Sequence, residues 1–345
     1  MKQQIDNPSK LLVIDFGQLG DVVLSLPALR AIRERFPKTR ITVAVGKSCG
    51  ELIKLSGYAD ETLMVDRVAL RDGFTPLSIV RIFKLVQDIR KDRFDFVIDL
   101  HSLSETNLLG FFSGARNRLY SRRPGRSLDF LSNVQPRPPA EDAKRKHAID
   151  RYLDVLVPLG IKNANRVPRL PTRSADDRYI EQTLRKFKAD AGSPLVGLFP
   201  GAGHPSRRWP LERFAELAEF LIRNDHVRVI VFAGPEEDSL VSSIRTMFPA
   251  TTVLLNRLSI SQLASAQARL AAFVSNDTGP MHIASAVGTP VVLLLDKRAP
   301  ETYLPLGEHH RTIYNNVISE IALEEVYEAT RSVLASGRTA TLFAS

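Results

Sequence analysis

The sequence predicts an α/β protein made of two domains, each with its own parallel sheet. Short apolar runs rich in Val, Ile and Leu alternate with amphipathic stretches, which is typical of buried parallel strands joined by helices. This alternation runs through the chain twice and is interrupted between Lys162 and Pro194. At 345 residues the chain is also longer than one hydrophobic core usually supports. We therefore expect one domain over residues 1–173 and a second over residues 174–345.

The apolar pattern assigns each element in turn. In the first domain we expect strands at residues 11–15, 40–45, 61–65 and 94–100, with helices at 21–36, 48–55 and 76–91. In the second we expect strands at 195–199, 227–233, 251–254, 271–275 and 291–295, with helices at 211–224, 238–247, 259–268 and 279–286, and an amphipathic segment at 176–188 precedes the first of these strands. A last helix is expected over residues 318–334, for which packing back on the first domain is one option.

Composition excludes several classes of protein. Apolar residues make up 44% of the chain and charged residues 25%, so a disordered or fibrous protein is excluded. The single cysteine, Cys49, excludes a disulfide scaffold and a cysteine-rich zinc site, and it fits a reducing cytoplasm. The longest apolar runs are too short to span a bilayer, and the N-terminal residues lack the apolar core of a signal peptide.

The net charge of +9 belongs to the first domain. Residues 1–173 hold 30 Lys and Arg against 19 Asp and Glu, whereas residues 174–345 hold 17 against 19. Many of these cations lie in an aperiodic stretch over residues 116–147, which we expect to be a long functional loop. They are Arg116, Arg118, Arg122, Arg123, Arg126, Arg137, Lys144, Arg145 and Lys146. An excess of positive charge in one domain attracts nucleic acid, a membrane surface or a phosphorylated substrate. The alternative is that the charge only keeps the protein soluble.

The first expected strand runs into a glycine-containing loop and then a helix. Gly17 and Gly20 would let the backbone turn and approach a ligand. Asp21, at the start of the helix, has two interpretations. It caps the helix by accepting backbone N–H bonds, or it acts as a general base at the carboxyl end of the strand, where open α/β sheets bind ligands. The third glycine of Gly-x-Gly-x-x-Gly is missing, so this is not a dinucleotide fingerprint.

The second domain opens with a similar corner. Gly201 and Gly203 would free the backbone there, and Arg207 and Arg208 precede a helix expected to begin at Pro210. Backbone amides, a helix N-terminus and guanidinium groups together suit a phosphate or diphosphate. Two arginines on a solvated loop are the alternative.

A third corner follows the strand that is expected to end at Ser275. Asp277 could cap the next helix and leave the amides of Thr278 and Gly279 directed at an anion, and His282 lies one turn into that helix. A buried structural histidine is the commoner role for such a residue. Three corners that each place glycine beside ionic groups favour an anionic ligand between the two halves. No Asp-x-Asp pair, phosphate loop or His-Glu-x-x-His is present, so we expect chemistry without a metal.

Several stretches together resemble glycosyltransferase family nine, the ADP-heptose:lipopolysaccharide heptosyltransferases and their relatives. In chain order they are LGDVVLSLPAL, FDFVIDLHSL, HAIDRYL, RRWPLERFAELA, VFAGPEED and NDTGPMHIASAVGTP. The resemblance covers nearly the whole chain. It implies a GT-B fold, in which two Rossmann-like domains face each other across a cleft, with the acceptor in the first domain and the sugar nucleotide mainly in the second.

The resemblance also implies roles for individual residues. Asp21 matches the family's proposed base, which would take a proton from the acceptor hydroxyl as that oxygen attacks the anomeric carbon and inverts it. The leaving nucleoside diphosphate would be held by residues 277–279 and by Arg207. Glu237 would bond the ribose, and His282 would orient the diphosphate.

Partners and location follow from the same resemblance. We expect a nucleotide-sugar donor, in the first place ADP-heptose, with no further cofactor, and a phosphorylated glycolipid acceptor facing the basic stretch 116–146. The protein would be cytoplasmic and peripheral at the inner membrane. The family often has Lys or Arg where Asp15 stands, His where Leu24 stands, and Phe-Gly-Pro-Thr where residues 293–300 read LLLDKRAP.

Two other classes of function stay open on the sequence. A GT-B epimerase would convert a nucleotide sugar without any acceptor. A non-catalytic anion-binding or nucleic-acid-binding protein would fit the pI of 9.7. Tyr120 and Phe130 are, however, the only Phe, Tyr or Trp residues in the basic stretch. Aromatic side chains on which bases could stack are therefore scarce, and we expect no nucleic acid as a partner.

Overall fold

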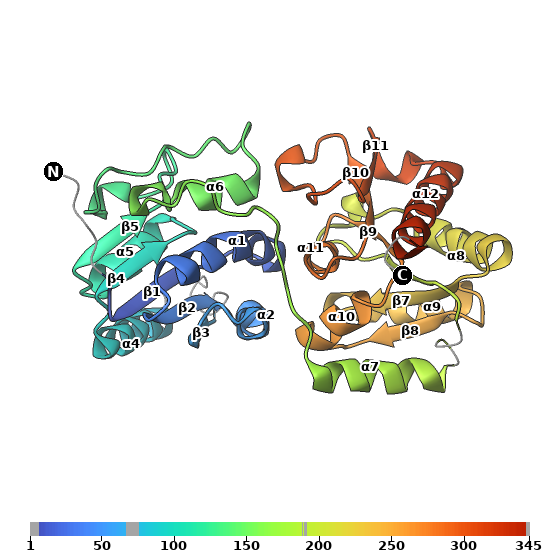
Figure 1. Ribbon diagram of the computed structural model, residues 1–345, viewed down its shortest axis with the longest axis horizontal. Helices are drawn as coiled ribbons and strands as arrows, with labels where there is room; N and C mark the ends of the chain where they lie inside the picture. The colour runs from blue at the N-terminus through green and yellow to red at the C-terminus, as the bar shows by residue number, and fades with distance from the viewer. Residues whose placement is uncertain (1–6, 67–75, 188, 190–191, 343–345) are drawn as a thin grey trace. The chain divides into compact units, whose positions relative to one another are not determined.

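The computed structural model describes residues 7–66, 76–187, 189 and 192–342, and it divides into two compact units (Figure 1). The first unit comprises Met1–Pro168 and the second Arg169–Ser345, so the division lies close to the expected boundary at Arg173. Among the described residues, no helix is both long and apolar enough to cross a membrane.

The first unit is built on a five-stranded parallel sheet with the order β3-β2-β1-β4-β5. Its strands are β1 (Lys10–Asp15), β2 (Arg40–Gly46), β3 (Glu61–Val65), β4 (Phe96–Asp99) and β5 (Asn117–Tyr120). Its helices are α1 (Leu19–Arg35), α2 (Gly50–Ser56), α4 (Pro76–Asp92), α5 (Ser104–Phe112) and α6 (Ala148–Asp154). The strand order reverses between β1 and β4, and such switch points are where open α/β sheets bind ligands at their carboxyl edge.

Strands β1, β2 and β4 are almost entirely buried because both faces of the sheet are covered there, whereas the edge strands β3 and β5 are partly exposed. Alternate residues of a strand point to opposite faces, and Leu12 and Ile14 share a core with Ile89 of α4 and Leu109 of α5. Residues of α1 from Val22 to Ile32 are almost all buried as well. The first unit is thus a three-layer α/β/α domain.

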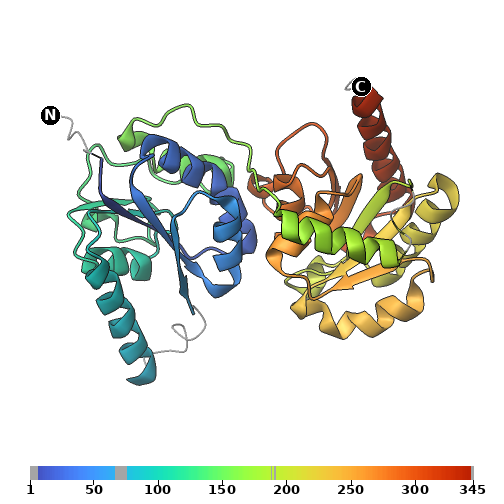
Figure 2. The ribbon, with the colours of Figure 1, turned by 60° about the horizontal axis from the view of Figure 1, so that its bottom comes forward.

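The second unit has a six-stranded parallel sheet with the order β11-β10-β9-β6-β7-β8. Its strands are β6 (Leu195–Phe199), β7 (Arg228–Ala233), β8 (Val253–Asn256), β9 (Ala272–Asn276), β10 (Val291–Asp296) and β11 (Arg311–Asn315). Its helices are α7 (Ser174–Lys186), α8 (Leu211–Asp225), α9 (Val241–Met247), α10 (Ile260–Gln267), α11 (Gly279–Ala286) and α12 (Leu323–Leu342). Here the order reverses between β6 and β9. Helix α7 packs beside α10, as both ribbon views show (Figures 1 and 2).

Helix α12 corrects one expectation. It covers Leu323–Leu342 and follows a short 3-10 helix at Ile318–Glu320, where the sequence suggested one helix over residues 318–334. Its apolar side chains, among them Val326 and Leu334, belong to the core of the second unit together with residues of α8. The apolar face of this helix is therefore buried in its own unit.

The stretch 116–147 is a second correction. It begins with β5, which pairs with β4, and it contains a 3-10 helix at Asp129–Leu131 and a bridge between Arg122 and Ala140. The expected aperiodic loop is therefore an edge strand followed by a segment held by defined backbone contacts. Strand β11 and helix α5 were not predicted either.

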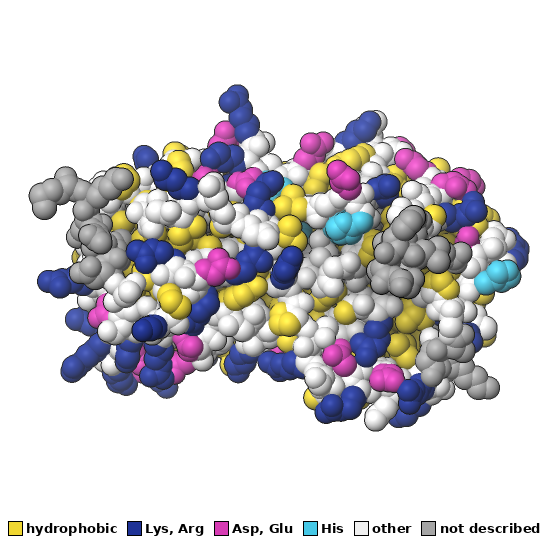
Figure 3. Space-filling view, viewed as in Figure 1, with side chains coloured by type: hydrophobic (Ala, Val, Ile, Leu, Met, Phe, Trp, Pro, Cys, Tyr) yellow, Lys and Arg dark blue, Asp and Glu magenta, His cyan; other side chains and the backbone are white. Residues whose placement is uncertain are grey.

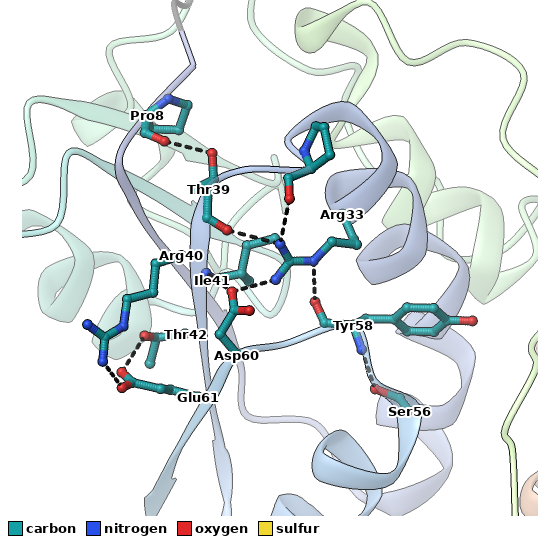
Figure 4. A network of polar contacts seen from close by, with 11 residues as sticks. Pro8, Arg33, Thr39, Arg40, Ile41, Thr42, Ser56, Tyr58, Asp60 and Glu61 are labelled. Atoms are coloured by element: carbon teal, nitrogen blue, oxygen red, sulfur yellow. Dashed lines mark hydrogen bonds and ion pairs between the residues drawn. The ribbon is translucent and has the colours of Figure 1, made fainter.

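The amino edge of the first sheet is held by a network of ion pairs (Figure 4). The Arg33 guanidinium donates to the carbonyl oxygens of Tyr58 and Thr39 at 3.3 and 3.0 Å, and to the Asp60 carboxylate at 2.5 Å. Asp60 also accepts the Ile41 amide at 2.7 Å. Although burial raises it, the hydrogen bonds from Ile41 and Arg33 hold the pKa of Asp60 below its usual value. This network ties the starts of β2 and β3 to α1.

Candidate functional site

The β1–α1 corner lies at the carboxyl edge of the first sheet. Asp15, the last residue of β1, is fully buried, and its Oδ1 accepts the Gly17 amide at 3.0 Å. A Cβ atom on Gly17 would lie 2.5 Å from Cβ of Asp21 and 3.1 Å from Oδ1 of Asp15, so only glycine fits there. Gly20 lies inside the first turn of α1 and has no positive φ. The structure therefore shows a close approach that requires glycine at Gly17, and the predicted role of Gly20 stays a prediction.

Asp21 is the third residue of α1 and is partly exposed. Its Oδ2 accepts the Gln18 amide at 3.0 Å, which is the capping contact that the sequence suggested. This is the one hydrogen bond that its side chain makes to the described part of the chain. The other carboxylate oxygen can therefore face a ligand while the capping bond stays intact.

A second buried carboxylate, Asp99, ends β4 on the other side of the switch point. Its Oδ1 accepts the Ser102 amide at 2.7 Å, and its Oδ2 accepts Nδ2 of Asn107 at 2.7 Å. Burial raises the pKa of Asp99 to about 7, against these hydrogen bonds and the charge of Arg123. Sequence reasoning missed this residue, because an acidic residue at a strand end carries no signal of the burial that perturbs it.

Several cations of the stretch 116–147 are turned inward. Arg123 pairs with Glu141 at 2.6 Å, and the other oxygen of Glu141 pairs with Arg151 of α6 at 2.6 Å. Arg122 pairs with Asp129 at 3.2 Å. The expectation that the whole stretch faces a ligand is therefore too broad, because these guanidinium groups already have carboxylate partners. Exposed cations with no side-chain pair in the described structure are Arg116, Arg126, Lys144 and Arg145. Figure 3 shows that Lys and Arg side chains are numerous over the surface of the first unit.

In the second unit, the loop after β6 packs on the loop after β7. Glu237 is 4% exposed, and its Oε2 accepts the Gly234 amide at 3.0 Å. A Cβ on Gly201 would lie 2.2 Å from Oε1 of Glu237, so Gly201 is required by this close approach, whereas Gly203 has open space and no positive φ. Burial raises the pKa of Glu237.

The two predicted arginines of this loop differ in their contacts. The Arg208 guanidinium donates to the carbonyl oxygen of Ala202 at 3.2 and 2.9 Å, so Arg208 braces its own loop. Arg207 lies in a short 3-10 helix, Pro205–Arg207, and its side chain lines a pocket. Helix α8 begins at Leu211, as the apolar pattern predicted, with Pro210 as its N-cap.

Asn276, the last residue of β9, joins these elements and was not predicted. Its Nδ2 donates to the carbonyl oxygens of Pro200 and Gly201 at 3.1 Å each, and its Oδ1 accepts the Trp209 amide at 3.0 Å. Trp209 in turn donates its ring N–H to the carbonyl oxygen of Ile321 at 3.0 Å. The buried Asn276 side chain thus fixes the β6 loop against the end of β9, on both sides of the switch point.

The pocket at this edge has a volume of about 300 Å³. Its lining residues are Ser206, Arg207, Asp277, Leu294, Leu295, Asp296, Arg298, Ala299 and Ile318. Arg298 bonds the Asp296 carboxylate with its amide at 2.8 Å and with its guanidinium, which lowers the pKa of Asp296 to about 2. Of the predicted residues, the pocket brings Arg207 and Asp277 together.

The corner between β9 and α11 differs from the expectation in one respect. Thr278, not Asp277, occupies the N-cap of α11, and its side chain makes no capping hydrogen bond. Helix α11 begins at Gly279, and His282 is buried on it. Asp277 lies one residue before the N-cap position of this helix.

Comparison with known proteins decides between the open classes of function. A family model for glycosyltransferase family 9 (heptosyltransferase) matches residues 82–328. The chain belongs to this family. It is 26% identical over 314 residues to lipopolysaccharide heptosyltransferase 2 of Escherichia coli strain K12, covering 88% of this chain and 87% of that protein. The protein is therefore a glycosyltransferase, and the family match favours this class over an epimerase or a binding protein.

Solved structures show the same fold. The crystal structure of a family 9 glycosyl transferase from Veillonella parvula superposes with a TM-score of 0.85 at 22% identity, over 97% of this chain and 99% of that one. The ADP-heptose lipopolysaccharide heptosyltransferase II of E. coli gives a TM-score of 0.78 at 23% identity, over 95% and 99%. The fold class is GT-B, with two Rossmann-like domains, as the sequence predicted.

Proposed function

We propose that this protein transfers heptose from ADP-heptose to the core of a lipopolysaccharide, with inversion at the anomeric carbon and without a metal ion. The observation that carries the proposal is the β1–α1 corner, where Asp21 presents a carboxylate oxygen at the switch point of the first sheet in a family 9 chain. Support for the substrates comes from the relatives, which are named as lipopolysaccharide heptosyltransferases.

In this proposal Asp21 is the general base. It takes the proton of an acceptor hydroxyl while the hydroxyl oxygen attacks the anomeric carbon of the donor. The new glycosidic bond forms as the bond between that carbon and the diphosphate oxygen breaks, and ADP leaves with the bonding electron pair. Attack from the side opposite the leaving group inverts the configuration. The proton ends on Asp21, which then returns it to solvent.

The second unit would bind the donor. Arg207 supplies positive charge to the diphosphate in the pocket that it shares with Asp277. The first amides of α11, at Thr278 and Gly279, add the partial positive charge of a helix N-terminus, and His282 on the same helix would orient the diphosphate. The backbone near Gly203 and the hydrogen bond from Arg208 to the carbonyl oxygen of Ala202 would hold the same loop in place.

Glu237 is proposed to bond the ribose. One of its oxygens accepts the Gly234 amide, and a carboxylate has further lone pairs for a diol. Gly201 must stay free of a side chain for Glu237 to keep this position. A Gly201→Ala variant would therefore lose affinity for ADP together with ordered packing of the loop.

The acceptor would approach the first unit. Its phosphates would meet the exposed cations Arg116, Arg126, Lys144 and Arg145 rather than the arginines that are already paired with carboxylates. A phosphorylated glycolipid resides in a membrane, so the proposal includes peripheral attachment at the cytoplasmic face of the inner membrane.

The decisive experiment is Asp21→Asn, which keeps the size of the side chain and removes the base. With ADP-heptose and a heptose-deficient lipopolysaccharide acceptor, we expect kcat to fall by about 10² to 10⁴-fold, the usual contribution of a general base. The dissociation constant of ADP should not change. Asp88→Asn, an exposed change on α4, is the matched control. Transfer that survives in Asp21→Asn would refute the mechanism.

Three further measurements test the donor, the class of reaction and metal independence. A thermal-shift panel of ADP, UDP and GDP should show stabilisation by ADP alone, since a ligand at 100 times its dissociation constant stabilises by about 2.7 kcal/mol. Conversion of the nucleotide sugar without acceptor would point to an epimerase instead. Activity that disappears with EDTA and returns with a divalent cation would refute metal independence.

A further inference from the structure

The β1–α1 corner is built around the buried carboxylate of Asp15. We propose that Asp15 is a positioning residue for the transfer reaction: it accepts the Gly17 amide and thereby fixes the turn that places Asp21. This inference rests on the proposed role of Asp21 as the base. Asp15 itself is fully buried at the end of β1, so it does not touch the acceptor.

One hydrogen bond ties Asp15 to the residues just before Asp21. Its Oδ1 accepts the Gly17 amide at 3.0 Å. Its Oδ2 is buried and has no hydrogen-bond partner in the described part of the chain, so the Gly17 amide is the contact that this carboxylate makes with the turn. The Asp15 carboxylate therefore fixes the loop that leads into the helix at Asp21.

Gly17 transmits the position of Asp15 to Asp21. The space where a Gly17 side chain would stand is bounded by Oδ1 of Asp15 at 3.1 Å and by Cβ of Asp21 at 2.5 Å. The backbone of residue 17 is thus packed between the two acidic side chains. A shift of the turn would displace Asp21 directly, because its own capping bond comes from Gln18, the next residue of the same turn.

The positive charge of Arg123 acts on both buried carboxylates. Arg123, from the segment after β5, favours the ionised forms of Asp15 and Asp99, against the larger effect of burial. Arg123 is itself paired with Glu141, whose second oxygen pairs with Arg151 of α6.

A pair of substitutions separates positioning from general stability. In Asp15→Asn, the amide oxygen can still accept the Gly17 N–H, and its NH₂ group can donate to the Ser25 hydroxyl, which itself donates to the carbonyl oxygen of Val22. In Asp15→Ala the turn loses its acceptor. We expect kcat to fall by about 100-fold in Asp15→Ala, because small displacements of a reacting group cost that much. Asp15→Asn should keep most of the wild-type kcat.

The KM for the donor and the dissociation constant of ADP should be unchanged in both variants, because the proposed donor site lies in the other unit. Asp60→Ala, at the amino edge of the same sheet, is the matched control: it removes a carboxylate that accepts a backbone amide and should leave kcat unchanged. Thermal unfolding of all three shows how much stability each change removes.

Three outcomes would overturn the inference: wild-type kcat in Asp15→Ala, an equal loss of kcat in Asp60→Ala, or an equal loss in Asp15→Asn. If Asp15→Ala does not fold, Asp15→Leu gives the same test, because it keeps the approximate size of the side chain and removes the hydrogen-bond acceptor. Failure of the proposed function is recognised separately, since it would appear as full transfer by Asp21→Asn.

Discussion

The two edges of the first sheet carry charged groups in opposite ways. At the amino edge, Arg33 and Asp60 form a partly exposed pair, and hydrogen bonds hold the pKa of Asp60 low. At the carboxyl edge, Asp15 and Asp99 are fully buried, and burial raises the pKa of both. Both edges bind backbone amides through carboxylates, so the hydrogen bonds alone do not distinguish them.

The two edges differ in the free energy that an ionised carboxylate costs. The amino edge stabilises an ionised carboxylate and joins the starts of two strands to a helix, which is a structural role. The carboxyl edge keeps carboxylates where water is absent, and perturbed groups of this kind concentrate at functional sites. The direction of the pKa shift thus separates an edge that holds the sheet together from an edge that carries the proposed chemistry.

The largest effect in this comparison is expected when one glycine at each edge of the first sheet is replaced by alanine. Gly17→Ala at the carboxyl edge would push Cβ into Asp21, and we expect kcat to fall by about 100-fold through displacement of the base. Gly57→Ala follows α2 near the amino edge, where φ is 72° and no atom obstructs a Cβ. This change should cost about 1 kcal/mol of stability through the left-handed backbone and leave kcat unchanged. Steady-state kinetics and denaturant unfolding measure both, and equal kinetic losses would break the comparison.

A large effect on stability alone is expected from Arg33→Ala. The change removes the guanidinium that bonds Thr39, Tyr58 and Asp60. We expect the free energy of unfolding to fall by about 2 kcal/mol, the range for hydrogen bonds to charged groups. The dissociation constant of ADP and kcat should stay at their wild-type values, and a loss of either would show that the amino edge is not purely structural.

The pH dependence of stability should differ in sign between the edges. A carboxyl with a lowered pKa stabilises the fold above its unfolded value and loses this contribution on acidification, so Asp60→Asn should flatten the decline in stability at low pH. The pKa of Asp99 is raised to about 7 in the folded state, from 3.8 in the unfolded chain. Asp99 therefore stabilises the fold fully below pH 3.8, and this stabilisation is lost as the pH rises toward 7. Asp99→Asn should therefore remove a decline between these values. Unfolding midpoints measured from below pH 3.8, where Asp60 titrates, up to about pH 7, where Asp99 titrates, test both, and slopes of the same sign would contradict the assignment.

The smallest effect is expected from Glu61→Gln, also at the amino edge. Glu61 pairs with Arg40, and both side chains are about half exposed. Exposed ion pairs contribute little, so we expect no measurable change in unfolding midpoint or activity. A clear fall in the unfolding midpoint would mean that the pair of Arg40 and Glu61 also stabilises this edge, as Arg33 does.

The fold was predictable where the signal was local. The apolar runs of β1, β6 and β9 stand out because both faces of a parallel strand are buried, and the glycine-containing corners after them follow directly. Strand β5, with the sequence NRLY, was missed because it is short and polar at the sheet edge. The stretch 116–147 was predicted to be an irregular loop because this short, polar strand gives it no apolar pattern.

The candidate site was predictable only in part. Gly17, Gly201, Arg207 and Asp277 lie at the corners where the sequence placed them. The links among corners could not be predicted, because they join residues far apart in the chain, as Asn276 does with Pro200 and Trp209. Burial has the same non-local origin, and it determines why Asp15 and Asp99 differ from other acidic residues.

The contacts of Trp209 have a spectroscopic consequence. It is the only tryptophan of the chain, and it lies in the core of the second unit with its amide bonded to Asn276, the residue before Asp277. Excitation at the red edge of the protein absorption therefore reports on the second unit alone, while the first unit is silent at that wavelength. The natural chain thus contains a fluorophore that can report on the proposed nucleotide binding, and that can tell the unfolding of one unit from that of the other.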